Sequence, residues 1–333
     1  MSDTSVVNVK APYVAKNHRG QYRHKPTKPF RERLKLSIKR YWFFYLAILP
    51  GLVIVAIYNY GPMILQVVLA FTNYRFVDGI FGSEWVGFNN FKVLFTQTPE
   101  IMRVIENTLV MSFWSFISGF FPSLILAIIL FDVHSRKLQR SAQTIVYIPY
   151  FFSWVIVYGI FYALLSNTGV LNSILKSWFN VTEDFLMDPK YIRTILIVSS
   201  TWKGMGWGTI IYLAAMQGID PTLYDVAKLD GCGPIRRIFA VTLPGIRNIT
   251  VFLFVLAIGS ILSGGITEQI LLFYNPANYS KSDTIGTWIF RIGYGMFEYS
   301  LGAALSFLQS TIGMILVLVG NHIAIRRYGV GIW

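Results

Sequence analysis

Six long stretches of apolar residues alternate with polar segments along this chain. They cover roughly residues 42–71, 107–131, 142–165, 191–217, 244–267 and 302–325. Each stretch holds the roughly 20 apolar residues that a helix needs to cross the hydrocarbon core of a bilayer. The pattern therefore predicts an all-α, polytopic membrane protein with about six transmembrane helices. The first stretch is overlong and contains Pro50-Gly51 and Gly61-Pro62, so we expect it to be kinked or tilted.

The first 40 residues follow a different pattern. They are polar, rich in Lys and Arg, and interrupted by Pro12, Pro26 and Pro29. We expect residues 1–40 to form a basic cytoplasmic tail that is partly disordered, followed by a transmembrane permease domain over residues 41–333. Leu34 and Ile38 lie four residues apart, which predicts a short interfacial helix before the first span. The tail is too long for a signal peptide and no cleavage pattern follows it.

The composition supports the membrane interpretation. Hydrophobic residues make up 54% of the 333 residues and charged residues only 14%, which is too apolar for a soluble domain of this length. The net charge is +13, and eleven of the 29 Lys and Arg residues lie in the basic tail. Such a tail could bind nucleic acid, but beside a transmembrane span it marks the cytoplasmic side and meets anionic lipid. We therefore expect the membrane, and no nucleic acid, as its partner.

The polar loops carry unequal charge. Segment 132–141 holds three basic residues and segment 218–247 holds four, whereas the other three loops are longer and poorer in Lys and Arg. The positive-inside rule predicts that both termini and the 218–244 loop face the cytoplasm of a bacterial cell. Cys232, the one cysteine, lies in that loop, so an intrachain disulfide is impossible.

The 218–244 loop has the pattern of two short helices joined by a turn. Asp220 can cap a helix that begins at Pro221, because proline lacks only an N–H that a first helical turn leaves unused. Gly231 stands where a helix end favours a left-handed residue, and Pro234 can begin a second helix. Such a unit at a membrane surface could dock a soluble partner, and it could equally be an ordinary connection between two spans.

Several kinds of chemistry are missing from the sequence. The chain has no Gly-Lys dipeptide and therefore no phosphate-binding loop of the ATPase class. Its four histidines are scattered, and none has a second ligand at metal-site spacing. Gly204, Gly206 and Gly208 lie within an apolar span without a preceding strand, so they do not indicate dinucleotide binding. Gly204 and Gly208 are instead spaced for close helix packing. We predict no catalytic residue, no metal site and no enzymatic activity.

The 218–244 loop also resembles the signature loop of bacterial ABC-importer permeases, in which Glu-Ala-Ala is followed at fixed spacing by Asp-Gly, an aromatic residue and Leu-Pro. The corresponding residues here are Asp225, Val226, Ala227, Asp230, Gly231, Phe239, Leu243 and Pro244. Asp stands in place of Glu and Val in place of the first Ala, and both changes are conservative.

Other segments extend the resemblance to residues 40–333. The sequence from Trp85 to Phe91 is similar to a segment that follows the first span in the sugar (maltose-type) permeases. Glu268-Gln269 and the following residues up to Pro276 resemble the narrower branch for complex saccharides and aldouronates. The terminal Trp333 is also common in that branch. The resemblance does not identify the saccharide.

The resemblance implies an ABC importer permease fold and a set of partners. These would be a second homologous permease subunit, two ATP-binding subunits, an extracellular solute-binding protein and an oligosaccharide substrate. ATP and Mg would be bound by the ATPase, and this chain would hold no cofactor. It also implies that the signature residues from Asp225 to Pro244 couple the permease to the ATPase.

The substrate path is predicted from residue types. The candidates are Lys203, Trp202, Trp207, Tyr158, Glu268 and Gln269. Lys203 lies roughly 18 Å into its span, where a charge costs on the order of 2.5–3.5 kcal/mol. It is either a structural contact at a helix interface or a counter-charge for an acidic saccharide. The aromatic residues either stack on sugar rings or are part of the core and interface.

Two other functions stay open on the sequence alone. A secondary transporter would couple transport to protons or sodium through carboxylates inside the spans, but Glu106, Asp132 and Glu268 all lie at span ends. A membrane receptor or scaffold could bind partners through the same loop without transport. Uptake that depends on ATP would distinguish an ABC importer from a secondary transporter. Any uptake at all would exclude a receptor or scaffold.

Overall fold

The computed structural model describes residues 30–259, 261–262, 265–329 and 331–332. The predictions for residues 1–29 lie outside this part of the chain. The chain divides into two compact units, one ending at Ile64 and one beginning at Leu65.

The first unit is a long helix that is irregular where the sequence predicts a kink. It consists of α1 (Phe30–Val55), the π-helical turn η1 (Ala56–Tyr60) and the start of α2 (Gly61–Phe71). The short helix predicted around Leu34 and Ile38 is confirmed as helical, with a break in the backbone at Tyr41 (φ −118°, ψ 20°). The wider turn η1 directly precedes Gly61-Pro62, because Pro62 lacks an N–H and its ring crowds the preceding helical turn.

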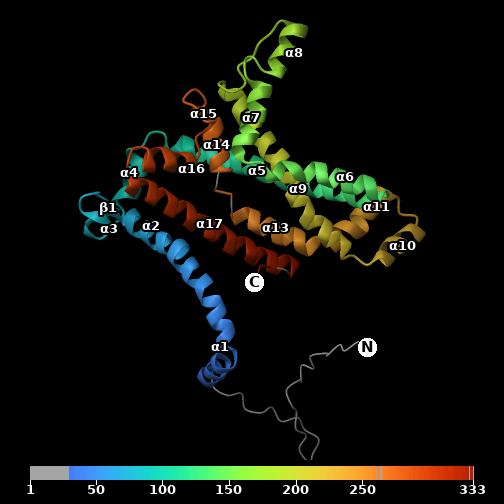
Figure 1. The fold of residues 1–333 in the computed structure, drawn as a ribbon, viewed down its shortest axis with the longest axis horizontal. Helices are drawn as coiled ribbons and strands as arrows, with labels where there is room; N and C mark the ends of the chain where they lie inside the picture. Colours follow the sequence, from blue (N-terminus) through green and yellow to red (C-terminus); the bar gives the residue numbers. More distant parts are fainter. Residues whose placement is uncertain (1–29, 260, 263–264, 330, 333) are drawn as a thin grey trace, which may run out of the picture. The chain divides into compact units, whose positions relative to one another are not determined.

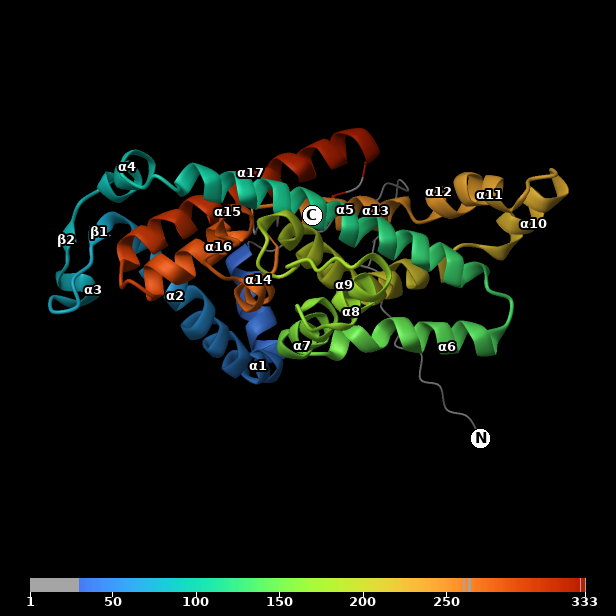
Figure 2. The same cartoon turned by 90° about the horizontal axis from the view of Figure 1, so that it is seen from above.

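The second unit is built around two long parallel helices, α5 (Ile101–Asp132) and α9 (Pro189–Gln217), which pack along their length. Figures 1 and 2 show α13 (Arg247–Gly259) and α17 (Tyr299–Tyr328) beside this pair. Near the N-terminal end of α5 lie a small hairpin and two short helices. These elements are β1 (Thr72–Asn73), α3 (Gly79–Gly82), β2 (Glu84–Trp85) and α4 (Asn89–Thr96). The two strands pair antiparallel, with Thr72 opposite Trp85.

The segment between α5 and α9 contains three helices and a break. The helices are α6 (Arg136–Tyr147), α7 (Trp154–Leu165) and α8 (Val170–Phe179). The predicted span 142–165 is interrupted by the 3-10 turn η2 (Ile148–Phe151) around Pro149, so it is not one continuous helix. Residues 170–179, which the sequence places in an outside loop, form the helix α8.

The chain from Pro221 onwards contains the remaining short elements. They are α10 (Pro221–Leu229), α11 (Pro234–Arg237), η3 (Ile238–Thr242), α12 (Leu243–Gly245), α14 (Thr267–Phe273), α15 (Tyr279–Ser282), α16 (Ile285–Trp288) and η4 (Ile289–Tyr294).

Within the described residues, four helices are long and apolar enough to cross a membrane, or five if a bent pair is counted as one span. The bent pair is 234–245 with 247–259, which meet at 69°. The sequence predicts about six spans. The difference lies at α9, which has 29 residues but lower hydropathy because Lys190, Arg193 and Lys203 interrupt its apolar surface.

Close packing of α9 depends on glycine, although not on both glycines that the spacing indicates. A Cβ on Gly208 would lie 2.5 Å from the Ser123 hydroxyl on α5, and one on Gly206 would overlap the carbonyl of Val146 on α6. At Gly204 a Cβ would meet nothing within 4 Å. The packing prediction is therefore confirmed for Gly208 and wrong for Gly204, because Gly206 makes the second close approach.

Candidate functional site

The 218–244 loop folds as its capping residues predict. The Asp220 carboxylate accepts a hydrogen bond from the Thr222 N–H at 2.9 Å, and this bond lowers the pKa of Asp220. Gly231 follows α10 with a φ of +73°, a left-handed conformation that favours glycine. The second helix begins at Pro234. The predicted pair of helices is confirmed.

Polar and apolar contacts hold α10 against the end of the bundle. The hydroxyls of Tyr224 and Thr242 share a hydrogen bond of 3.0 Å, which joins α10 to η3. The Tyr224 ring also lies 6.0 Å from the ring of Phe131 at the end of α5. Gly245 approaches Ile219 so closely that an added Cβ would lie 2.6 Å from its side chain. These contacts join α10 and the residues that flank it to the end of α5, to η3 and to α12.

The outer face of the loop is strongly apolar. Its exposed apolar residues are Leu223, Val226, Leu229, Ile235 and Phe239. Asp225 is also exposed and pairs with Lys228 at 3.1 Å. An exposed apolar surface of this size, with a charged residue within it, is typical of a protein-binding site.

The predicted coupling residues divide into two groups. Asp225, Val226, Asp230 and Pro244 are exposed, whereas Ala227 is only 7% exposed and its carbonyl accepts from the Cys232 N–H at 2.9 Å. Leu243 packs against a core cluster that includes Tyr212, Met216 and Ile246. Ala227, Gly231 and Leu243 therefore shape the loop, and the exposed residues form its surface.

Two cavities lie along the inner faces of α5 and α9. The larger, about 460 Å³, is bounded by α5, α9 and α13, and the smaller, about 310 Å³, lies towards α14. Both are lined by Ser115, Gly119, Ser123, Gly208, Gly265 and Ile266. Small and hydroxyl-bearing side chains on facing helices leave this space open, and apolar side chains such as Phe116, Leu253 and Ile261 line the rest of the larger cavity.

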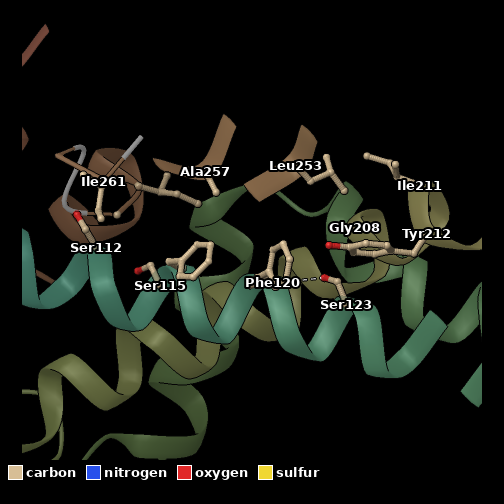
Figure 3. Close-up of a pocket in the computed structure, with 14 residues that line it drawn as sticks. Ser112, Ser115, Phe120, Ser123, Gly208, Ile211, Tyr212, Leu253, Ala257 and Ile261 are labelled. Carbon is tan, nitrogen blue, oxygen red and sulfur yellow. Dashed lines mark hydrogen bonds between the residues drawn. The ribbon is translucent and has the colours of Figure 1, made fainter. Parts of the chain in front are cut away.

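Tyr212 closes one end of the larger cavity. Its ring packs edge-on against that of Phe120, at a centroid distance of 6.1 Å. Figure 3 shows the two rings side by side, with the Tyr212 hydroxyl turned into the pocket. Tyr212 is 2% exposed, and its hydroxyl has no hydrogen-bond partner among the described residues. A buried hydroxyl without a partner is unfavourable, so a solute that supplied one would be stabilised here.

Lys203 lies in a group of aromatic residues. Its ammonium donates a hydrogen bond to the Tyr150 carbonyl at 2.7 Å. The same nitrogen lies 5.2 Å from the ring centroid of Tyr150 and 5.3 Å from that of Trp154. Trp207, which lines the smaller cavity, stacks on Tyr150 at 4.6 Å. These contacts place a cation among aromatic faces beside the cavity.

The other path candidates lie apart from this group. Trp202 packs against the rings of Phe152 and Phe161, and Tyr158 packs against Phe273 at 5.0 Å. Glu268 is exposed in the first turn of α14 and interacts electrostatically with Lys203. The structure therefore brings Lys203 and Trp207 together, with Glu268 nearby, and separates them from Trp202 and Tyr158.

Gln269 has a different environment from Glu268. It is 2% exposed, and its amide donates to the Leu196 carbonyl and to the Ser199 hydroxyl, both at 2.7 Å. These bonds join α14 to α9. The Gln269 side chain also lines the smaller cavity.

Sequence reasoning missed Tyr150 as part of the site. Tyr150 follows Pro149 directly, and Pro149 ends the helix and frees carbonyls that a regular helix would use. A lysine deep in one span and a proline in the neighbouring span are the signals that could have located this contact. Among the described residues, no group of three or more His, Cys, Asp or Glu side chains could hold a metal ion.

Comparison with known proteins decides the class of the molecule. Residues 109–327 match the family model described as "Binding-protein-dependent transport system inner membrane component". This chain belongs to that family. The matched part contains the signature loop, both cavities and the Lys203 group.

Relatives of the permease cover nearly all of its length. It is 37% identical over 289 residues to the protein LplB of Bacillus subtilis (strain 168), covering 86% of this chain and 90% of LplB. It is 35% identical over 301 residues to YteP, a polygalacturonan/rhamnogalacturonan transport system permease of the same organism, covering 90% and 92% of the two chains.

A chain in the crystal structure of a bacterial alginate ABC transporter in complex with an alginate pentasaccharide-bound periplasmic protein is 36% identical. It superimposes with a TM-score of 0.82, covering 90% of this chain and all of that one.

Family membership resolves several predictions. The permease is an inner-membrane, multi-pass component of an ABC transporter and not the ATP-hydrolysing subunit, so ATP is not a cofactor of this chain. The ABC importer permease fold and the complex-saccharide branch are confirmed. The secondary-transporter alternative is wrong, because the matched family works through binding proteins.

Proposed function

We propose that this permease forms part of the translocation path of an ABC importer for acidic oligosaccharides. It pairs with a second homologous permease, two ATP-binding subunits bind from the cytoplasm, and an extracellular solute-binding protein delivers the cargo. The proposal places both termini and the 218–244 loop in the cytoplasm, in accord with the basic residues of those segments.

The contacts of Lys203 are the single observation that supports an acidic cargo. Its ammonium has three donors, and among the described residues one of them is taken by the Tyr150 carbonyl. A uronate unit offers a carboxylate for the remaining donors and a ring face for Trp207. Two relatives with acidic polysaccharides in their names, polygalacturonan and alginate, support the same chemistry.

Coupling to ATP hydrolysis is assigned to α10 and its flanking turns. Asp225, Val226 and Asp230 present the surface that binds the ATPase, with Pro244 at its edge, and Ala227, Gly231 and Leu243 hold that surface in shape. The loop drives a conformational change only if it binds one state of the ATPase better than the other. The bonds from α10 to η3 then carry that difference into the bundle.

Reconstituted transport tests the proposal. The importer is assembled in liposomes with its ATPase and solute-binding protein, and uptake of labelled tri-galacturonate and maltotriose is measured with and without ATP. We expect ATP-dependent uptake of the acidic trisaccharide and little of the neutral one. Uptake that is driven by a proton or sodium gradient without ATP, or a preference for the neutral sugar, would contradict the proposal.

A further inference from the structure

The lysine in the middle of α9 has an acidic neighbour to which it is not bonded. Glu268, in the first turn of α14, interacts electrostatically with Lys203. No carboxylate of the described chain lies within ion-pair distance of the Lys203 ammonium, which donates to the Tyr150 carbonyl instead. A cation and an anion therefore face the same region without forming a direct pair, although charges in a membrane protein normally pair with one another.

The position of Glu268 relative to α9 is set by the residue that follows it. The buried Gln269 amide donates to the Leu196 carbonyl and the Ser199 hydroxyl of α9, both at 2.7 Å. Ser199 lies four residues before Lys203, so both side chains lie on the same face of α9. The first turn of α14 is thus attached to α9 about one helical turn, or roughly 5.4 Å along the axis, from Lys203.

The smaller cavity opens beside both charges. On α9 it is lined by Gly204 and Trp207, which are the residue after Lys203 and the residue one turn beyond it. On the other side it is lined by Ile266 and Gln269, which flank Glu268 in the sequence. A uronate unit in this cavity would therefore lie near a cation and near a carboxylate at the same time.

The Glu268 carboxylate is not needed to hold α14 in place. Its side chain is exposed, and it accepts no hydrogen bond from the part of the chain that the structure describes. A carboxylate in a first helical turn is favoured by the helix dipole, but that effect is small at an exposed position. The attachment to α9 is made by Gln269, which leaves the charge of Glu268 free to act on the cavity.

We propose that Glu268 is the resident counter-charge of Lys203 and that an acidic saccharide takes over this role during transit. In the empty permease the carboxylate partly neutralises the ammonium. When a uronate carboxylate approaches Lys203, Glu268 repels it, which lowers the affinity for the cargo and speeds its release. A transport site must bind weakly enough for its cargo to leave. This inference rests on the proposed function, because it needs an acidic cargo at Lys203.

Cargo affinity and transport rate, measured separately, test this role. Equilibrium dialysis gives the Kd of labelled tri-galacturonate for the detergent-solubilised importer without its solute-binding protein. ATP-driven uptake at saturating cargo gives the maximal rate. In Glu268→Gln we expect a Kd about tenfold lower and a maximal rate about threefold lower, because the repulsion that releases the cargo is lost. Glu268→Asp keeps the charge and should stay within about twofold of the unaltered permease in both measurements.

Glu106 offers a matched control. It is also an exposed glutamate that interacts electrostatically with a basic residue of α9, in this case Arg193. Arg193 lies ten residues before Lys203, which is about 15 Å along the helix. Glu106→Gln therefore removes the same charge at a distance from the cavity, and we expect it to change the Kd and the maximal rate less than about twofold. Maltotriose carries no charge and should bind equally to all these variants.

The outcomes separate this inference from the proposed function. If the unaltered importer binds tri-galacturonate no better than maltotriose, both are overturned. If it prefers the acidic sugar and loses that preference in Lys203→Gln, an unchanged or higher Kd in Glu268→Gln overturns the role of Glu268 alone. Tighter binding of maltotriose in Glu268→Gln would also overturn it. In a Lys203→Gln background, Glu268→Gln should no longer lower the Kd, whereas an undiminished effect there would show that Glu268 does not act through Lys203.

Discussion

Arg291 and Asp283 form an ion pair at 2.6 Å in which the Asp283 side chain is fully buried and that of Arg291 is 22% exposed. Tyr274 and Thr287 donate to the same carboxylate, each at 2.9 Å. Burial and the charge of Asp283 raise the pKa of Tyr274, so its hydroxyl stays protonated and able to donate. The Asp283 carboxylate thus joins three side chains of the segment between α14 and α17 to one another.

This carboxylate makes a prediction about stability. Asp283→Asn removes the charge but leaves Arg291 partly buried, so we expect a loss of about 3–5 kcal/mol in the free energy of unfolding. Thermal unfolding of the detergent-solubilised permease measures it. Arg75→Gln is the control, because it breaks the exposed Arg75–Asp78 contact at 3.8 Å and should have almost no effect. Equal unfolding temperatures for the two variants would show that the buried pair does not stabilise the segment.

The same residue connects segments that are distant in the sequence. Asn107 on α5 donates to the Asp283 carbonyl at 2.9 Å and accepts from Arg193 on α9 at 2.6 Å. No local pattern in the sequence predicts contacts between residues 86 and 176 positions apart. By contrast, the caps at Asp220 and Gly231 were predicted correctly, because capping depends on neighbouring residues alone.

The remaining differences have similar causes. The break at residues 148–153 follows from Pro149, whose effect was not weighed when apolar length alone was used to predict one continuous helix. The helix α8 is too short for its apolar pattern to stand out within a polar segment. The position of Lys203 within a span was readable from the sequence, but its acceptor on Tyr150 required the three-dimensional structure.

The signature loop makes a prediction about coupling. Gly231→Pro forces a negative φ at a residue that has a φ of +73°, and Asp225→Lys reverses a charge on the exposed face of α10. We expect both variants to insert normally, because neither residue lies within a span, and to lose most binding-protein-stimulated ATP hydrolysis. Lys228→Ala, which only removes the partner of Asp225, should retain most of it. Stimulation at the unaltered level in both loop variants would contradict the coupling role.

Topology gives a third prediction. Cys232 is the one cysteine of the chain, so no other cysteine must be removed before it is used as a probe. A membrane-impermeant maleimide should fail to label it in intact cells. The same reagent should label it in inverted vesicles once the ATPase has been stripped away. Labelling in intact cells would show that the 218–244 loop faces the outside of the cell, which would contradict the proposed orientation.

The Tyr212→Phe variant tests whether the buried Tyr212 hydroxyl contacts the cargo or has only a structural role. Tyr212→Phe removes a buried hydroxyl that has no partner in the described chain, so the thermal stability of the permease should stay the same or rise. If the hydroxyl binds the oligosaccharide in transit, maximal uptake should fall about tenfold at the same time. Unchanged uptake would assign the larger cavity to packing alone.

The charge of Lys203 directly tests whether the permease selects an acidic saccharide. Lys203→Gln keeps a donor for the Tyr150 carbonyl and removes the cation, and Lys203→Arg keeps the cation. ATP-driven uptake of tri-galacturonate and maltotriose is measured for both variants in reconstituted importer. We expect Lys203→Gln to lower uptake of the acidic sugar at least about tenfold relative to the neutral one, and Lys203→Arg to retain the preference. An unchanged ratio in Lys203→Gln, or an equal loss for both sugars, would contradict the role of Lys203 in selecting an acidic saccharide.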